Sequence, residues 1–169
     1  MDTFPVAAIG HVDSSRREPV DDDWGIADST IALEAAFDGS ALRGLAEFSH
    51  IEVVYLFHLV DPAAVTTAAR RPRDNPELPE VGIFAQRGKG RPNRIGVSTC
   101  QLLGVDGTRV RVRGLDAIDG TPVLDIKPYM REFGRGARSA SPAGPTRSWA
   151  SISSPRRAPR SAARGEPGS

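Results

Sequence analysis

Cysteine is nearly absent from this chain: its 169 residues include only Cys100, so no internal disulfide can form. A single thiol fits a protein of the reducing cytosol. The three histidines, His11, His50 and His58, are scattered without metal-ligand spacing and without a cysteine cluster beside them. A zinc site is therefore not expected, and we predict a protein that needs no metal ion.

Long hydrophobic runs are absent as well. The longest apolar stretch, residues 53–60, is interrupted by His58 and is far shorter than the roughly 20 residues that cross a bilayer. The N-terminal residues 1–6 do not combine a charged leader with an apolar segment, so a secretion signal is not expected. We predict a cytoplasmic protein with no membrane partner.

Several common catalytic motifs are missing too. No Gly-x-Gly-x-x-Gly follows a strand-like segment, which argues against a dinucleotide-binding sheet. Gly88-Lys89-Gly90 is not a Walker phosphate loop. In a Walker loop the lysine is followed by serine or threonine, whereas here Lys89 is followed by Gly90. Ser49 and Ser98 lack the Gly-x-Ser-x-Gly setting of a hydrolase nucleophile.

Acidic and basic side chains are unevenly distributed. Residues 134–169 hold seven of the 22 basic side chains and one of the 21 acidic ones, which leaves 15 basic and 20 acidic side chains in residues 1–133. Large apolar side chains are few after residue 133, so we predict a basic, disordered C-terminal tail over 134–169. Such a tail could be an arm for RNA phosphates, an unstructured end without a role, or an out-of-frame reading of the gene.

Short segments rich in β-branched and aromatic residues, separated by turns, predict an all-β fold. The predicted strands cover residues 4–12, 29–34, 51–60, 80–86, 95–105, 108–113 and 122–126. Asp106-Gly107 between two of them is a strong hairpin signal. Only residues 41–48 predict a helix, a short one. This spacing of strands and turns favours a single β-barrel domain over residues 1–133, although it also suits a sandwich.

Within residues 1–133, where acidic side chains are in excess, the segment 70–94 is the one cluster of basic side chains. It holds seven basic side chains against three acidic ones. Prolines fix its course, and glycines at 82, 88 and 90 allow close backbone approach. A rigid, arginine-rich loop suits a carboxylate, a phosphate or a nucleic acid, and composition alone also fits a solvated surface loop.

Several sequence blocks together resemble the TrmO (TsaA-like) family. They are Asn75-Pro-Glu-Leu-Pro-Glu-Val-Gly-Ile-Phe-Ala-Gln86, Arg91-Pro-Asn93, Gly114-Leu-Asp-Ala-Ile-Asp119 and Asp119-Gly-Thr-Pro-Val-Leu-Asp125-Ile-Lys127-Pro-Tyr129. The resemblance covers about residues 6–133 and implies an S-adenosylmethionine-dependent methyltransferase built on a β-barrel. The best-known activity of the family is N6-methylation of threonylcarbamoyladenosine beside the tRNA anticodon. The chain departs from the family at Arg94, where proline is common.

The resemblance also implies site residues and a homodimer. The implied cofactor contacts are Arg91, the strand end Leu124, Asp125, Ile126 and Lys127, the N-terminal lid Trp24, Gly25 and Ile26, and, as further candidates, Asp61 and Gln101 or Leu102. If tRNA is the substrate, the basic segment 70–94 could hold the RNA backbone, with Arg71, Arg73, Arg87, Lys89 and Arg94 as the candidate contacts. Surface packing is the alternative role for Trp24.

The residues present suit this chemistry. Methyl transfer from a sulfonium needs positioning rather than a covalent nucleophile. Arg91 can hold the carboxylate of S-adenosylmethionine, and Asp125 can hold its amino group or, as a catalytic residue, accept a proton from the methylated amine. Two alternatives stay open: a methyltransferase acting on a small molecule, which the acidic body favours, and a non-enzymatic nucleic-acid-binding barrel.

Overall fold

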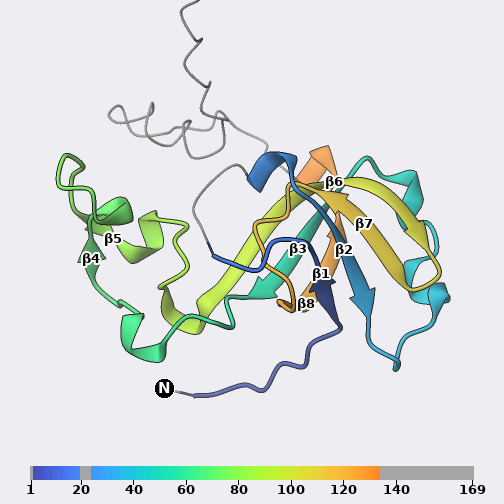
Figure 1. The fold of residues 1–169 in the computed structure, drawn as a ribbon, viewed down its shortest axis with the longest axis horizontal. Helices are drawn as coiled ribbons and strands as arrows, with labels where there is room; N and C mark the ends of the chain where they lie inside the picture. Colours follow the sequence, from blue (N-terminus) through green and yellow to red (C-terminus); the bar gives the residue numbers. More distant parts are fainter. Residues whose placement is uncertain (1, 20–23, 134–169) are drawn as a thin grey trace, which may run out of the picture.

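Six antiparallel strands close into a barrel in the computed structural model of the chain, which describes residues 2–19 and 24–133 (Figure 1). The order around the barrel is β1-β2-β7-β6-β3-β8. These strands are β1 (Gly10–Asp13), β2 (Asp28–Leu33), β3 (His50–Leu56), β6 (Ile95–Asp106), β7 (Arg109–Arg113) and β8 (Pro122–Pro128). The predicted all-β barrel is confirmed. The predicted tail lies outside the described residues, so the boundary at residue 133 stays a prediction.

The core of the barrel forms where alternation places every second side chain inside. Ile51, Val53 and Tyr55 of β3 are buried, as are Val110 and Val112 of β7, and none of the five is more than 1% exposed. The residues between the two valines and on either side of them are arginines, which the same alternation leaves in water. The strand predicted from this pattern over residues 108–113 is confirmed.

A bulge in β8 decides which face its polar residues occupy. Val54 of β3 lies opposite Asp125, whereas the next residue, Tyr55, lies opposite Val123, so Leu124 is an extra residue in β8. Because Tyr55 points into the core, its neighbour Val54 faces outward. Residues directly opposite each other share a face. Asp125 therefore lies on the outer surface of the barrel.

Between β3 and β6 the chain leaves the barrel for residues 57–94, drawn mainly in green in Figure 1. This excursion contains a separate two-stranded sheet of β4 (Ala69–Arg70) and β5 (Val81–Gly82), with the 3-10 helices η4 (Pro62–Ala64), η5 (Pro72–Asp74), η6 (Ile83–Ala85) and η7 (Pro92–Arg94). The strand predicted over residues 80–86 is wrong beyond Gly82. Its buried residues, Ile83 and Gln86, are three apart, which suits the period of a 3-10 turn rather than that of a strand.

The remaining helices are also short 3-10 turns. They are η1 (Trp24–Ile26), η2 (Gly39–Leu42), η3 (Leu45–Glu47) and η8 (Arg131–Phe133). The short helix predicted over residues 41–48 is thus divided in two by Gly44, whose φ of 84° is the left-handed conformation that glycine adopts most easily. No helix within the described part of the chain is long and apolar enough to cross a membrane.

Two predicted strands end earlier or begin later than expected. The strand predicted over residues 4–12 begins only at Gly10, because pairing with β2 and β8 starts there, and Phe4 is 80% exposed. The strand predicted over residues 51–60 ends at Leu56, where the pairing with β6 ends and the excursion begins. Apolar composition without a pairing partner did not extend either strand.

Candidate active site

Four predicted cofactor contacts lie at the bulge of β8: Leu124, Asp125, Ile126 and Lys127. The Asp125 carboxylate accepts a hydrogen bond from the Ile126 amide at 2.9 Å and forms an ion pair with the Lys127 ammonium group. The Asp125 side chain is 45% exposed and that of Lys127 is 60% exposed, whereas Ile126 packs against the core. The ion pair is therefore accessible to a ligand on the outer surface.

Gln101 lies on the same outer surface, two strands away. In β6 it pairs with His50 of β3, and two residues further along β3, Glu52 lies opposite Lys127. With strands about 4.8 Å apart, the Cα atoms of Gln101 and Lys127 are on the order of 12 Å apart. The outer face of β6, β3 and β8 thus brings these predicted contacts onto one surface.

Arg91 lies just before η7 and is held by Gln86. Its guanidinium Nη1 donates to the backbone oxygen of Gln86 at 2.9 Å. Gln86 is 5% exposed, and its side-chain amide donates to the carbonyl oxygens of Arg70 at 2.9 Å and Val81 at 2.8 Å. These two bonds fix Gln86 to β4 and β5, so the acceptor of Arg91 has a fixed position. Among the described residues the Arg91 fork makes no other hydrogen bond or ion pair, so its remaining N–H groups can bind a carboxylate.

The glycines of the basic loop make room for Arg70. A Cβ atom added at Gly88 would lie 2.7 Å from Nη2 of Arg70, and one added at Gly90 would lie 2.9 Å from the carbonyl oxygen of Ala64. The Nε of Arg70 is buried and has no hydrogen-bond partner among the described residues. Glycine at both positions therefore lets this part of the loop pack closely around the Arg70 guanidinium.

The predicted RNA-binding cations are bonded to backbone oxygens rather than to carboxylates. Arg71 donates to Leu78 at 2.5 Å, Arg87 to Val97 at 2.5 Å, Lys89 to Pro19 at 3.1 Å and Arg94 to Val60 at 2.9 Å. None of these four cations forms an ion pair with another described residue. The Arg73 side chain is outside the described set. A carbonyl orients a cation without neutralising it, so the loop stays positive.

Arg94 adopts a backbone conformation that proline cannot. Its φ is 55°, and that of the preceding Asn93 is 62°. Proline fixes φ near −65°, so the proline common at this position in the resembling family is incompatible with this turn. The bond from the Arg94 guanidinium to the Val60 carbonyl oxygen helps to hold this turn.

The predicted lid is the turn η1. Trp24 lies with its ring centroid 4.0 Å from the guanidinium carbon of Arg16. A Cβ atom added at Gly114 would lie 3.5 Å from the Gly25 carbonyl oxygen, and Ile26 is 69% exposed. An aromatic ring beside an exposed apolar side chain is a suitable surface for the flat, partly apolar face of a nucleoside.

Hydrogen bonds connect part of these residues and leave one group apart. Asp61 caps η4, and in the same turn the Thr66 amide donates to the Gly90 oxygen at 3.1 Å. Lys89 links this loop to Pro19 in the segment before η1. Within the described ranges, no hydrogen bond or ion pair joins either segment to Asp125. Among the described residues, hydrogen bonds therefore connect the loops with one another, whereas Asp125 bonds only within β8.

Two titratable groups of the barrel interior are held in their neutral forms. The Tyr55 hydroxyl bonds to the Ser98 hydroxyl at 3.1 Å, and burial raises the pKa of Tyr55 above its ordinary range, helped by the negative charge of Asp116. Burial also raises the pKa of Cys100 to about 12. In the described residues no cluster of three His, Cys, Asp or Glu side chains could hold a metal ion. The exposed Asp125 is thus better placed than these buried groups to accept a proton.

The residues that hold the predicted contacts in place were not predicted from the sequence. Gln86 supports Arg91, Arg70 fills the space over the loop glycines, and Arg16 covers the Trp24 ring. A glutamine at the end of the apolar run 81–85 gave a weak signal for a buried amide. The other two depend on contacts between distant parts of the chain, which the sequence does not reveal.

Comparisons with known proteins add to this geometry. The sequence model of the family described as tRNA-methyltransferase O N-terminal domain matches residues 19–135. A Mus musculus protein named tRNA (adenine(37)-N6)-methyltransferase is 41% identical over 93 residues, which cover 55% of this chain and 21% of that protein. A Methanothermobacter thermautotrophicus protein named as a probable S-adenosyl-L-methionine-binding protein is 42% identical over 93 residues, covering 55% of this chain and 64% of that one.

A solved structure is similar as well. A crystal structure of TrmO matches with a TM-score of 0.70 and 33% sequence identity, covering 85% of this chain and 65% of that one. This chain therefore spans less than two thirds of the length of each of these three proteins. The similarity therefore extends over only a part of each of the three proteins.

Proposed function

Because the chain belongs to the tRNA-methyltransferase O family, we propose that it is an S-adenosylmethionine-dependent methyltransferase that methylates N6 of an adenine beside the anticodon of tRNA. The observation that carries the proposal is the basic loop, whose cations are oriented by carbonyl oxygens and keep their charge. Both reactants bring anionic groups to such a loop, the carboxylate of the cofactor and the phosphates of RNA.

The described residues fit the cofactor by the chemistry of their donors and acceptors. Arg91, with N–H groups left after its bond to Gln86, would hold the carboxylate, and Asp125 would accept from the amino group. Trp24 in η1 would cover the adenine. S-adenosylmethionine, when bound, supplies a methyl group on a sulfonium.

The chain's own residues then position the target base and manage its proton. N6 of adenine loses a proton when it is methylated, and the accessible carboxylate of Asp125 is a candidate acceptor if it does not hold the amino group. Arg71, Arg73, Arg87, Lys89 and Arg94 would hold the RNA backbone. A base in an anticodon loop is already unpaired, so presenting it costs less than in a duplex.

The target adenine, in the finer form of this proposal, already carries a threonylcarbamoyl group. That group ends in a carboxylate, which the unneutralised cations of the loop suit. Methylation of tRNA with and without this group, followed by nucleoside analysis, tests the point. Equal rates on both substrates would refute the finer proposal and leave the adenine methyltransferase in place.

Cofactor binding is tested first, by calorimetric titration of S-adenosylmethionine with residues 134–169 present and removed. We expect micromolar binding in both forms. Arg91→Ala should raise Kd about 10–100-fold, since a hydrogen bond to a charged group is worth about 1.5–3 kcal/mol. Arg43→Ala, an exposed arginine at the end of η2, is the matched control and should leave Kd unchanged. Binding by no form would refute the methyltransferase proposal.

RNA binding is tested by the salt dependence of tRNA affinity. Arg71→Ala and Lys89→Ala should each weaken binding and lower the slope of log K against log salt by about one, while Arg43→Ala should not. The alternative of a small-molecule substrate is favoured by the acidic excess of residues 1–133. Cofactor binding together with weak tRNA binding and no methylated nucleoside would support that alternative.

We also propose a homodimer that acts in the cytoplasm. The outer face of β6 exposes Ile95 (38%) and Val97 (41%), opposite the half-buried Leu56 and Val54 of β3. Light scattering should show twice the monomer mass, and Val97→Glu should give a monomer. Phe37→Glu, a similar change at a residue before η2, should not. A monomeric parent chain would refute the dimer, and fractionation of cells tests the compartment.

A further inference from the structure

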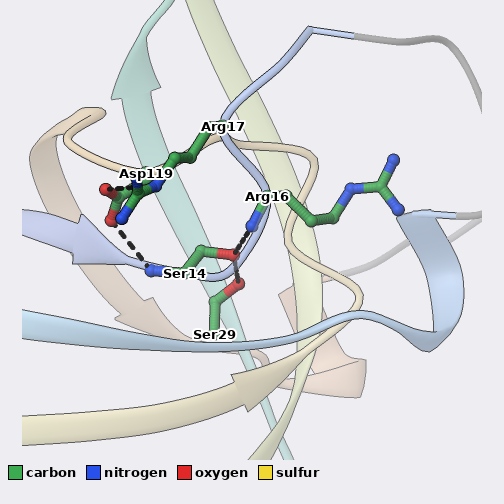
Figure 2. A network of polar contacts seen from close by, with 5 residues as sticks. All are labelled: Ser14, Arg16, Arg17, Ser29 and Asp119. Atoms are coloured by element: carbon green, nitrogen blue, oxygen red, sulfur yellow. Dashed lines mark hydrogen bonds and ion pairs between the residues drawn. The ribbon is translucent and has the colours of Figure 1, made fainter.

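Asp119 holds the chain segment that follows β1. Its carboxylate accepts a hydrogen bond from the Ser14 amide at 3.0 Å, and its own amide donates to the Arg16 carbonyl oxygen at 2.7 Å. The other carboxylate oxygen lies 4.0 Å from Nε of Arg17 (Figure 2). β1 has ended at Asp13, so Asp119 continues the attachment that strand pairing no longer provides.

The Ser14 hydroxyl completes this attachment and shapes the turn. It accepts from the Arg16 amide at 3.2 Å and from the Ser29 hydroxyl at 3.3 Å, and Ser29 is 6% exposed. In Figure 2 the side chain of Arg17 lies against Asp119, whereas that of Arg16 extends in the opposite direction. The turn therefore fixes the backbone of Arg16, from which the side chain reaches the Trp24 ring.

Arg16 connects this turn to the lid through its contact with Trp24. Its guanidinium carbon lies 4.0 Å from the ring centroid of Trp24, a cation–π contact. The segment that contains Asp119 also reaches the end of η1, because the Gly114 amide donates to the Ala27 oxygen at 3.0 Å. A Cβ atom added at Gly114 would lie 3.5 Å from the Gly25 carbonyl oxygen. Residues 114–119 thus form a common support for both sides of the lid.

We propose that Asp119 is a positioning residue, which through Ser14 and Arg16 sets the place of Trp24. The inference rests on the proposed function, in which Trp24 covers the cofactor or the target nucleoside. Asp119 itself does not touch either reactant. A lid that is already in place loses less conformational freedom when the ligand binds, so the benefit is tighter binding.

The test uses the full chain with Trp149→Phe, which leaves Trp24 as its only tryptophan. In this parent, Asp119→Ala removes the acceptor of Ser14, and Asp119→Asn keeps an oxygen there. Asp106→Ala, at the β6–β7 hairpin, is the matched control for the loss of a carboxylate. The two readouts are quenching of Trp24 fluorescence by acrylamide and the Kd of S-adenosylmethionine from calorimetry.

Asp119→Ala should raise the quenching constant about twofold and the cofactor Kd about fivefold, the effect of one lost hydrogen bond. Asp119→Asn should stay within about twofold of the parent, since one net hydrogen bond is kept. Should Asp119→Ala not fold, Arg16→Met, which keeps the turn but removes the guanidinium, should reproduce both changes. Unchanged quenching in the folded variants overturns the inference, and so does an unchanged Kd in a parent that binds. A parent that does not bind refutes the proposed function alone, because quenching still reports the position of Trp24.

Discussion

Gly96 of β6 lies where a side chain would collide with the Tyr55 ring of β3, and Gly96→Ala tests this packing. The two residues are paired in the sheet. A Cβ atom added at Gly96 would lie 2.4 Å from Cε2 and 2.5 Å from Cζ of the Tyr55 ring. The ring is 1% exposed, its hydroxyl bonds to Ser98, and its edge meets the Phe57 ring with centroids 5.3 Å apart. It has nowhere to move without disturbing these contacts.

The expected loss of stability follows from those contacts. Non-bonded carbons prefer about 3.5–4.0 Å, so the ring must shift by more than about 1 Å, and overpacking of this kind costs about 1–3 kcal/mol. If the shift breaks the bond to Ser98, a buried hydroxyl is left unsatisfied at about 1–3 kcal/mol more. The lower chain entropy of alanine in the unfolded state returns about 0.4–1 kcal/mol. We therefore expect the free energy of unfolding to fall by about 1–5 kcal/mol.

Urea unfolding followed by circular dichroism measures this difference. Gly104→Ala in the same strand is the control, because its added Cβ would meet only the end of the exposed Arg111 side chain, at 3.1 Å. That flexible group can move aside, and the expected change is within about 0.5 kcal/mol. If Gly96→Ala proves as stable as Gly104→Ala, the packing of Tyr55 against Gly96 is not what determines the spacing of β3 and β6.

Three further predictions concern the site and the barrel. Gln86→Ala should weaken cofactor binding about fivefold in calorimetry, because the backbone oxygen that accepts from Arg91 is no longer held in place. Gln86→Glu should weaken binding more, because it turns a carboxylate toward two carbonyl oxygens. Because burial raises the pKa of Cys100 to about 12, the native thiol stays protonated at pH 7–9, and a thiol reagent should label it only after unfolding; rapid labelling of the native protein would contradict this. Arg94→Pro should lower the free energy of unfolding by about 3 kcal/mol or more because φ at this position is 55°, whereas Arg94→Gly should be neutral or stabilising in urea unfolding.

The barrel was predictable from the sequence because its strands pack one face inward. The alternation over residues 108–113 correctly placed Val110 and Val112 in the core, and Asp106-Gly107 correctly marked a hairpin. Outside the barrel the same reasoning failed. Residues 80–86 are as apolar as a strand, but the sheet there offers only Arg70 and Ala69 as partners, so the chain turns after two residues.

Residue types at the site were predictable, but their arrangement was not. The faces of Asp125 and Lys127 depend on the extra residue Leu124, and a one-residue change of register reverses the faces of a strand. The support of Trp24 by Asp119 joins positions almost a hundred residues apart, a relation that no local pattern encodes. Sequence therefore indicates which chemistry is available, while pairing and turns decide where it is presented.

The excursion presents a positive surface within residues 1–133, although acidic side chains outnumber basic ones over that range. Residues 70–94 hold seven basic and three acidic side chains, so the rest of residues 1–133 holds eight basic and 17 acidic ones. An anion near the loop interacts mainly with charges within a Debye length, about 8–10 Å at physiological salt. The loop leaves the barrel before it presents its cations, and those cations are bonded to carbonyl oxygens, so their field is not cancelled locally. In the proposed complex, the acidic remainder of residues 1–133 would repel the phosphates of RNA, so that RNA would approach through the basic loop that contains Arg91.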